Sequence, residues 1–134
     1  MNPFSWPVRI YWEDTDAGGV VYYGNYLRYL ERARTEWLRA KGVDQSQLAA
    51  EHGVLFMVRA VNVEYQAPAR LDDRLLVTCE AVPEGRTTVI FQQRIFKEGV
   101  SAASERELLI DATVRVVCLD GRTMRPRRIA EYIP

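Results

Sequence analysis

Three acidic residues and a glycine pair lie close together near the N-terminus, in the segment from Glu13 to Tyr26. Asp14 and Asp16 are two residues apart, so their side chains share a face if the segment is extended, whereas Glu13 points away. The pattern predicts a carboxylate beside the start of a helix, where free N–H groups attract negative charge. A carboxylate can act as a nucleophile or general base, and free N–H groups can stabilise an oxyanion. Alternatively, the segment is an acidic turn that only connects a strand to a helix.

Other catalytic chemistries lack their residues in this sequence. His52 is the single histidine, and we interpret it as structural because no nucleophile-elbow pattern accompanies it. The sequence has no glycine-rich dinucleotide or phosphate-binding motif and no closely spaced cysteine or histidine pairs that would predict a metal site. Cys79 and Cys118 lie in apolar runs and are expected to be reduced core residues. Carboxylate chemistry remains, and it suits hydrolysis of an activated acyl group such as a thioester, because a thiolate leaves without strong protonation.

Length and composition predict one domain spanning residues 1–134, which is large enough to bury a core. Lys plus Arg and Asp plus Glu are 18 each, so no overall basic field favours nucleic-acid binding. No run approaches the roughly 18 apolar residues of a membrane-spanning helix, and Met1–Pro7 lacks the features of a signal peptide. We therefore expect a cytoplasmic protein.

A long amphipathic helix is predicted to follow the acidic segment. Asn25 is expected to cap this helix, which runs to about Lys41 and ends at Gly42. Its apolar stripe consists of Tyr26, Leu30, Ala33 and Trp37. Arg32 and Glu36 are predicted to form an (i, i+4) pair on the solvent side. The stripe must be buried against another element.

The remaining elements are a short helix and mostly strands. The short helix is predicted over Gln45–His52, with Asp44 as its cap and Gly53 after it. Strands are predicted over Val8–Trp12, Leu55–Tyr65, Leu75–Val82, Thr87–Phe96 and Leu108–Leu119. Three dipeptides are predicted to form turns after them: Glu84-Gly85, Glu98-Gly99 and Asp120-Gly121. One face of the first strand should carry Val8, Ile10 and Trp12, and one face of the second Leu55, Met57, Val61, Val63 and Tyr65. This order predicts an antiparallel α+β fold in which the long helix covers one sheet face and a second subunit covers the other.

The sequence also resembles a known family. Asp14–Tyr22, Asn25–Leu27 and Glu31–Glu36 are similar to the signature of the YbgC-type acyl-CoA thioesterases, which are hotdog-fold enzymes of the 4-hydroxybenzoyl-CoA thioesterase group. A second block, Val61–Tyr65 followed by Pro68–Asp73, matches their pattern as well. The resemblance covers essentially the whole chain. It implies a hotdog fold, in which a five-stranded antiparallel sheet wraps around one long helix.

The resemblance further implies an activity and two catalytic groups. Asp16 would be the catalytic carboxylate, as base or nucleophile, and the backbone N–H of Tyr23 would polarise the thioester carbonyl. Many YbgC-type sequences have histidine at the position of Tyr23, but the backbone N–H survives that change. Asp14 and Glu13 would be supporting residues. The implied reaction is hydrolysis of acyl-CoA, with short-chain or aromatic acyl groups favoured, and it needs no cofactor beyond the coenzyme A of the substrate.

Coenzyme A carries phosphates, so a basic surface is expected near the site. Arg127 and Arg128 belong to the densest basic cluster, which also contains Arg122 and Arg125 and which would bind phosphate or form a solvated tail. Arg59 and Arg70 are further candidates. Gly19, Val20, Tyr65 and Pro68 are expected to line the substrate groove, although Val20, Tyr65 and Pro68 are equally suited to the core.

The family association implies a homodimer that assembles to a homotetramer, and acyl carrier protein is a second candidate carrier. Two alternative functions remain open. One is a dehydratase of the same fold that acts on hydroxyacyl thioesters and requires a catalytic histidine. The other is a non-catalytic protein that binds acyl-CoA or acyl carrier protein, or a scaffold associated with the cell envelope or phospholipid metabolism.

Overall fold

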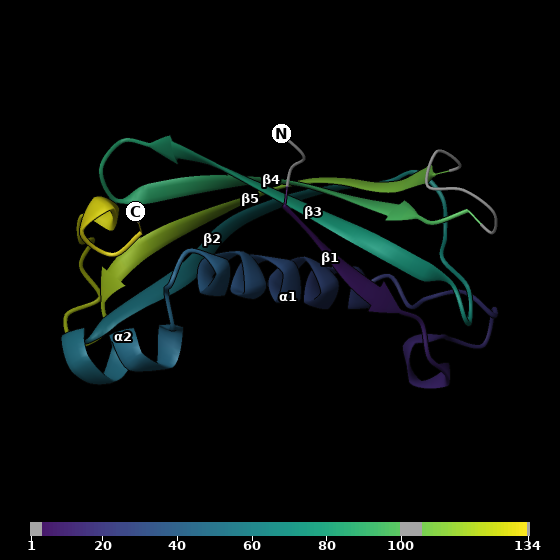
Figure 1. Ribbon diagram of the computed structural model, residues 1–134, viewed down its shortest axis with the longest axis horizontal. Helices are drawn as coiled ribbons and strands as arrows, with labels where there is room; N and C mark the ends of the chain where they lie inside the picture. The colour runs from purple at the N-terminus through teal and green to yellow at the C-terminus, as the bar shows by residue number, and fades with distance from the viewer. Residues whose placement is uncertain (1–3, 100–105, 134) are drawn as a thin grey trace.

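The computed structural model describes residues 4–99 and 106–133. Its five strands form one antiparallel sheet in the order β1-β3-β4-β5-β2, and the sheet curves around helix α1 (Figure 1). The strands are β1 (Phe4–Arg9), β2 (Val54–Tyr65), β3 (Arg74–Glu84), β4 (Thr88–Lys97) and β5 (Glu107–Asp120). The helices are α1 (Asn25–Ala40) and α2 (Gln45–His52). The predicted class, an α+β fold with the sheet wrapped around one long helix, is confirmed.

The apolar stripe of α1 packs against the concave face of the sheet. Tyr26, Leu30 and Ala33 are almost completely buried, whereas Trp37 is partly buried and packs edge-on against Phe91 with ring centroids 5.4 Å apart. The buried residues of the sheet alternate along its strands and include Leu75, Val77, Cys79, Phe91, Ile95, Ala112, Val114 and Cys118. Burial of each large apolar side chain contributes roughly 1.5–3 kcal/mol. The helix therefore has one favoured position inside the curve of the sheet.

Both cysteines lie in this core, as predicted. Cys79 and Cys118 are buried and are not joined by a disulfide. Burial raises the pKa of Cys79 to about 12 and the pKa of Cys118 to about 11. The thiols are therefore protonated at neutral pH and act as small apolar side chains.

The C-terminal ends of both helices follow the predicted glycine pattern. Gly42 has φ +83°, a left-handed conformation that favours glycine. Its N–H donates to the carbonyl oxygen of Arg39, and the N–H of Val43 donates to that of Leu38, both at 2.9 Å. This double hydrogen bond ends α1. Helix α2 spans the predicted residues, with a side-chain cap from Asp44 and left-handed Gly53 after its last residue.

Two predictions for α1 are wrong. The N-cap position is Gly24, and Asn25 is instead the first helical residue, with its side chain bound to the carbonyl oxygen of Asp14. Glu36 does not pair with Arg32, because its carboxylate binds the guanidinium of Arg39 at 3.0 Å. The Arg32 guanidinium lies over the ring of Tyr29.

The first strand lies earlier than predicted. Strand β1 pairs with β3 from Phe4 to Arg9, and the pairing stops where β3 begins, opposite Arg74. Ile10 is buried just beyond the strand. The chain then forms a short 3₁₀ turn at Trp12–Asp14. The side chain of Trp12 is consequently 78% exposed and does not share a buried face with Ile10.

The other four strands agree with prediction to within one or two residues at each end, but β2 does not alternate as predicted. A β-bulge between Val58 and Ala60 leaves Arg59 without a partner on β5. One extra residue reverses the alternation of side chains. Leu55 and Met57, before the bulge, therefore lie on the opposite face from Val61, Val63 and Tyr65, and the predicted common face is wrong. Strand β2 is also an edge of the sheet.

Two of the three predicted turns are described in full. A hairpin turn containing Gly85 joins β3 to β4, and Asp120 begins a turn in which its carboxylate accepts hydrogen bonds from the N–H groups of Arg122 and Thr123. Glu98 and Gly99 follow β4, but the rest of that connection, residues 100–105, lies outside the described residues.

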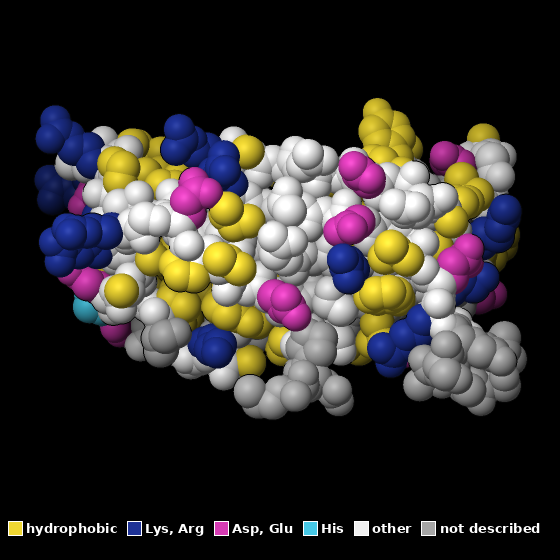
Figure 2. Space-filling model, turned by 90° about the horizontal axis from the view of Figure 1, so that it is seen from above, with side chains coloured by type: hydrophobic (Ala, Val, Ile, Leu, Met, Phe, Trp, Pro, Cys, Tyr) yellow, Lys and Arg dark blue, Asp and Glu magenta, His cyan; other side chains and the backbone are white. Residues whose placement is uncertain are grey.

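The convex face of the sheet is mixed in character (Figure 2). Its residues include Thr78, Glu80, Gln92, Arg94, Asp111 and Thr113, all partly or fully exposed. Arg94 and Asp111 form an ion pair across neighbouring strands at 3.6 Å. The composition of this face therefore gives no support to the expectation that a second subunit must cover it. Within residues 4–99 and 106–133, neither helix has the length and apolar content needed to cross a membrane.

Candidate active site

The acidic segment forms a tight loop between β1 and α1. Thr15 and Val21 pair as an isolated antiparallel bridge. Inside this bridge, the N–H of Asp16 donates to the carbonyl oxygen of Val20 at 2.9 Å, and the N–H of Gly19 donates to that of Asp16 at 3.0 Å. Gly19 has φ +79°, so glycine suits the sharpest point of the loop.

The Asp16 side chain is held in part and remains accessible. Its Oδ1 atom accepts a hydrogen bond from the N–H of Gly18 at 2.8 Å. Among the described residues, Oδ2 has no hydrogen-bond partner, and the residue is exposed. One carboxylate oxygen is thus free to meet a substrate or a water molecule.

Asp14 and Asp16 were expected to share a face of an extended segment, but the chain forms a 3₁₀ turn at Trp12–Asp14. Asp14 instead makes structural hydrogen bonds. Its carboxylate Oδ2 accepts the N–H of Tyr11 at 2.8 Å across the 3₁₀ turn. Its carbonyl oxygen accepts both the N–H of Tyr22 at 3.0 Å and Nδ2 of Asn25 at 2.9 Å. Asp14 therefore ties the acidic loop to the start of α1. The sequence analysis missed Asn25 in this role, although the residue belongs to the family signature.

The start of α1 offers free hydrogen-bond donors. The N–H groups of Tyr23 and Gly24 donate to no acceptor within the described part of the chain. Such orphan groups, together with the aligned peptide dipoles, make a helix N-terminus electropositive. The bridge between Thr15 and Val21 sets the segment that carries Asp16 beside the segment that leads into these donors. An oxyanion that forms there can be stabilised by the Tyr23 N–H.

Tyrosine rings border this surface. The hydroxyl of Tyr65, at the end of β2, donates to the carbonyl oxygen of Tyr23 at 3.2 Å. The ring of Tyr23 lies 4.8 Å from that of Tyr22 and 6.4 Å from that of Tyr65. The rings of Tyr26 and Tyr65 pack together with their centroids 5.7 Å apart, and the hydroxyl of Tyr26 accepts a hydrogen bond from the N–H of Ala69 at 2.9 Å. These contacts hold the Tyr23 peptide in place.

Three tyrosine hydroxyls near the loop have a raised pKa. Burial raises the pKa of Tyr26 and of Tyr65, and it raises the pKa of Tyr29 further, with an added contribution from the Asp14 carboxylate. The hydroxyls of Tyr26, Tyr29 and Tyr65 are therefore unsuited to act as the base at neutral pH, whereas a carboxylate is suited to that role.

Most of the predicted substrate-binding residues gather around the loop. Val20 pairs with Arg70 as an isolated bridge, and the N–H of Val21 donates to the carbonyl oxygen of Ala69. Pro68 adjoins this contact, and Pro68 and Tyr65 are exposed. Gly19 and Val20 thus belong to the loop with Asp16, Tyr65 and Pro68 lie beside the segment that follows it, and Arg70 is the basic candidate that accompanies them.

The other predicted arginines lie elsewhere. Arg59 occupies the bulge in the middle of β2. Arg127 and Arg128 belong to the C-terminal segment, which lies beside α2 at the opposite end of α1 from the acidic loop (Figure 1). Figure 2 shows Lys and Arg side chains gathered at that end. A single chain therefore does not bring these three arginines to Asp16.

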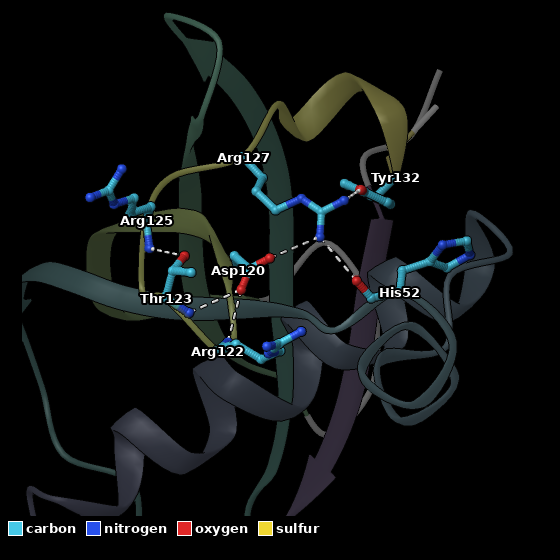
Figure 3. Close-up of polar contacts among 7 residues, drawn as sticks. All are labelled: His52, Asp120, Arg122, Thr123, Arg125, Arg127 and Tyr132. Carbon is cyan, nitrogen blue, oxygen red and sulfur yellow. Dashed lines mark hydrogen bonds and ion pairs between the residues drawn. The ribbon is translucent and has the colours of Figure 1, made fainter.

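Arg127 is already engaged within the chain (Figure 3). Its guanidinium donates to the carbonyl oxygen of His52 at 2.9 Å and to Oδ2 of Asp120 at 3.4 Å, and it also binds the hydroxyl of Tyr132. Backbone N–H groups of Thr123 and Arg122 hold the pKa of Asp120 below its usual range. The network fastens the C-terminal segment to the junction of α2 and β2.

The same network accounts for the histidine. The ring of His52 packs against Tyr132 with centroids 5.9 Å apart, far along the chain from the acidic loop and at the other end of α1 (Figure 1). Within the described residues, no group of His, Cys, Asp or Glu is arranged to hold a metal ion.

Comparison with known proteins shows the family of the chain. The model of the thioesterase-like superfamily matches residues 10–132. The chain is 48% identical over 130 residues to the acyl-CoA thioester hydrolase YbgC of Escherichia coli O6:H1, covering 97% of this chain and 92% of that protein. It is 42% identical over 125 residues to the acyl-CoA thioesterase YbgC of Haemophilus influenzae, covering 93% and 87%.

The solved structures include a mutant of 4-hydroxybenzoyl CoA thioesterase in complex with 4-hydroxybenzoyl CoA. It aligns with a TM-score of 0.85 at 22% identity, over 96% of this chain and 94% of that one. This likeness concerns the fold and confirms the hotdog architecture. The chain belongs to the thioesterase-like superfamily, and its resemblance to the YbgC-type proteins is confirmed by the identities above.

We expect Asn25→Ala to lower the free energy of unfolding by about 1 kcal/mol, because it removes one of two hydrogen bonds to the Asp14 carbonyl. Urea denaturation measures the change. Gln47→Ala is the control, since that side chain binds only the exposed Glu51, and its effect should stay below about 0.5 kcal/mol. Equal losses in the two variants would contradict the role assigned to Asn25.

We expect Arg127→Met to lower the free energy of unfolding by about 2 kcal/mol, because His52, Asp120 and Tyr132 all lose a charged partner. The exposed neighbour Arg128 makes no side-chain hydrogen bond within the described residues, so Arg128→Met should change stability by less than about 0.5 kcal/mol. Thermal and urea unfolding of both variants test this, and an unchanged Arg127→Met protein would refute it.

Proposed function

We propose that this protein hydrolyses acyl-CoA thioesters to a free acid and coenzyme A. The observation that carries the proposal is a loop, closed by the bridge between Thr15 and Val21, that has a free carboxylate oxygen at Asp16 and an unpaired N–H at Tyr23. The names of the relatives at 48% and 42% identity support the same activity. Short-chain and aromatic acyl groups are the proposed substrates.

The geometry suits a two-group mechanism. The thioester carbonyl oxygen accepts the N–H of Tyr23, and an oxyanion develops there as the carbonyl carbon is attacked. Asp16 either attacks that carbon, forming an anhydride that water then cleaves, or removes a proton from the attacking water. The carbon–sulfur bond breaks, and the thiolate of coenzyme A leaves. One backbone donor of this kind contributes about 3 kcal/mol to stabilising the transition state.

Asp16→Asn is expected to lower kcat by about 10²–10⁴-fold, since the amide is neither a general base nor a competent nucleophile. Release of free thiol from a panel of short, long and aromatic acyl-CoA substrates measures the effect. Glu13→Gln is the matched control, because Glu13 is exposed in the same segment, and it should keep turnover within a few-fold of wild type. Near-normal turnover of Asp16→Asn would overturn the proposed role of Asp16.

The same assay separates the alternative functions. A dehydratase would form an enoyl product and release no thiol. The packing of the His52 ring against Tyr132, away from the acidic loop of its own chain, disfavours this chemistry. A non-catalytic binding protein would bind acyl-CoA with negligible turnover, and the accessible Asp16 carboxylate disfavours that function. Comparing acyl-CoA with acyl carrier protein as the thioester donor decides which carrier is used.

We also propose a homodimer joined through strand β2, with a homotetramer as the larger assembly. Strand β2 is an edge with exposed apolar side chains, including Leu55, Met57, Val58 and Val61, and such edges favour pairing with another strand. Antiparallel pairing would reverse the second copy, so that its α2 end lies beside Tyr65 of the first. The basic cluster of one copy would then approach the acidic loop of the other, as phosphate binding by Arg127 and Arg128 requires.

A cytoplasmic location is proposed on the evidence of the core. Cys79 and Cys118 are free, buried thiols, and unpaired cysteines are typical of proteins from reducing compartments.

Val61→Lys is expected to convert the assembly to monomers, because a charge on the open edge of β2 opposes strand pairing. Val82→Lys is the control: Val82 is exposed to a similar degree, 49% against 43%, but lies on β3 inside the sheet. Analytical ultracentrifugation should show monomers for the first variant and at least dimers for the second. A wild-type monomer, or a dimer that survives Val61→Lys, would exclude the β2 interface.

A further inference from the structure

The hydroxyl of Tyr29 lies inside the protein, one helical turn beyond the start of α1. Tyr29 is 1% exposed, and its hydroxyl oxygen has no hydrogen-bond partner within residues 4–99 and 106–133. Buried hydroxyls in folded proteins are almost always paired, because an unpaired one destabilises the fold. The Tyr29 hydroxyl therefore requires an acceptor close by.

Helix geometry directs this hydroxyl toward the acidic loop. Tyr29 follows Asn25 by four residues, so the two side chains lie on one face of α1, and both lean toward the N-terminus of the helix. The side chain of Asn25 binds the carbonyl oxygen of Asp14 at 2.9 Å. The longer side chain of Tyr29 begins one turn further from the loop and extends toward the same residue.

The carboxylate of Asp14 is the acceptor that Tyr29 meets there. Burial is the main cause of the raised pKa of Tyr29, and the Asp14 carboxylate adds to the rise because it lies close to the hydroxyl. Oδ2 of Asp14 accepts the N–H of Tyr11 at 2.8 Å, whereas Oδ1 has no partner among the described residues. A carboxylate accepts hydrogen bonds at both oxygens. A free donor and a free acceptor are thus neighbours.

Other contacts hold the Tyr29 ring in place. It packs edge-on against Tyr26 with ring centroids 6.0 Å apart, and the guanidinium of Arg32 lies over it, 5.6 Å from its centroid. Arg32 and Asp14 line the same cavity of about 220 Å³ beside β1. The ring is therefore fixed next to the carboxylate, and only the rotation of the hydroxyl is needed to complete a hydrogen bond.

We propose that Tyr29 is a positioning residue of the candidate active site, and that its hydroxyl donates to Oδ1 of Asp14. Asp14 is then held at both ends: its carboxylate binds Tyr29 and the N–H of Tyr11, and its carbonyl oxygen binds Tyr22 and Asn25. The helix grips the acidic loop from inside through Tyr29 and at its own N-terminus through Asn25.

This grip bears on the two reacting groups. Asp14 stands two residues before Asp16, and the N–H of Tyr22 that it accepts directly precedes the N–H of Tyr23. Movement of Asp14 shifts the carboxylate and the oxyanion donor relative to each other, and a misplacement of about 1 Å can lower a rate about 100-fold. The effect on rate rests on the proposed hydrolase activity, whereas the hydrogen bond itself does not.

Urea denaturation tests the hydrogen bond without an assay of activity. Tyr29→Phe should lower the folding equilibrium constant about tenfold, because it removes a charge-assisted bond. Tyr11→Phe is the matched control: its side chain is 61% exposed and its backbone N–H keeps the bond to Asp14, so the constant should change less than about twofold. If the Tyr29 hydroxyl had no partner, Tyr29→Phe would fold as favourably as wild type or more so, which overturns the proposal.

Hydrolysis kinetics test the positioning role. Tyr29→Phe should lower kcat about tenfold and leave KM within about twofold, since no contact with substrate is lost. In an Asp14→Asn background the same substitution should change kcat less than about twofold, because the effect is transmitted through the carboxylate. An unchanged kcat in Tyr29→Phe, or equal losses in both backgrounds, overturns the positioning role. An inactive wild type refutes the proposed function instead, and the urea result still decides the hydrogen bond.

Discussion

The burial of helix α1 in the concave face of the sheet is the constraint on which the rest of the structure depends. Leu30 and Ala33 are completely buried there, and the helix cannot rotate without exposing its apolar stripe. Its position places its N-terminus against the β1–α1 loop and its C-terminus, ended by Gly42, against α2. Both the acidic loop and helix α2 are therefore located by the same packed helix.

The candidate active site is built mainly from backbone groups. The bridge between Thr15 and Val21, the carbonyl oxygen of Asp14 and the free N–H of Tyr23 hold the reacting groups. Side chains at Asn25 and Tyr65 fix these backbone groups through hydrogen bonds. Such preorganised donors need no rearrangement as charge develops, which is the condition for effective oxyanion stabilisation. The side chain at position 23 does not enter this arrangement, because the donor is the backbone N–H.

The acidic loop and the basic C-terminal cluster lie at opposite ends of α1 (Figure 1). Within that cluster, Arg127 has a structural role, because its guanidinium binds His52, Asp120 and Tyr132 of the same chain. The open edge of β2 runs between the two ends. In the proposed dimer, antiparallel pairing along this edge would bring the basic cluster of one copy close to the acidic loop of the other.

Local pattern determined much of this protein. Apolar periodicity and glycine positions predicted both helices, four of the five strands and the end of α1 at Gly42, because these signals act within a few residues. The family signature singled out Asp16 and the Tyr23 amide. Tertiary structure decided the rest. The extent of β1 depends on where β3 begins, the bulge at Arg59 depends on pairing with β5, and the bond between Asn25 and Asp14 spans the loop. The separation of Arg127 from Asp16 within the chain follows from the packing of the C-terminal segment against α2, which joins residues far apart in the sequence and which no local pattern reports.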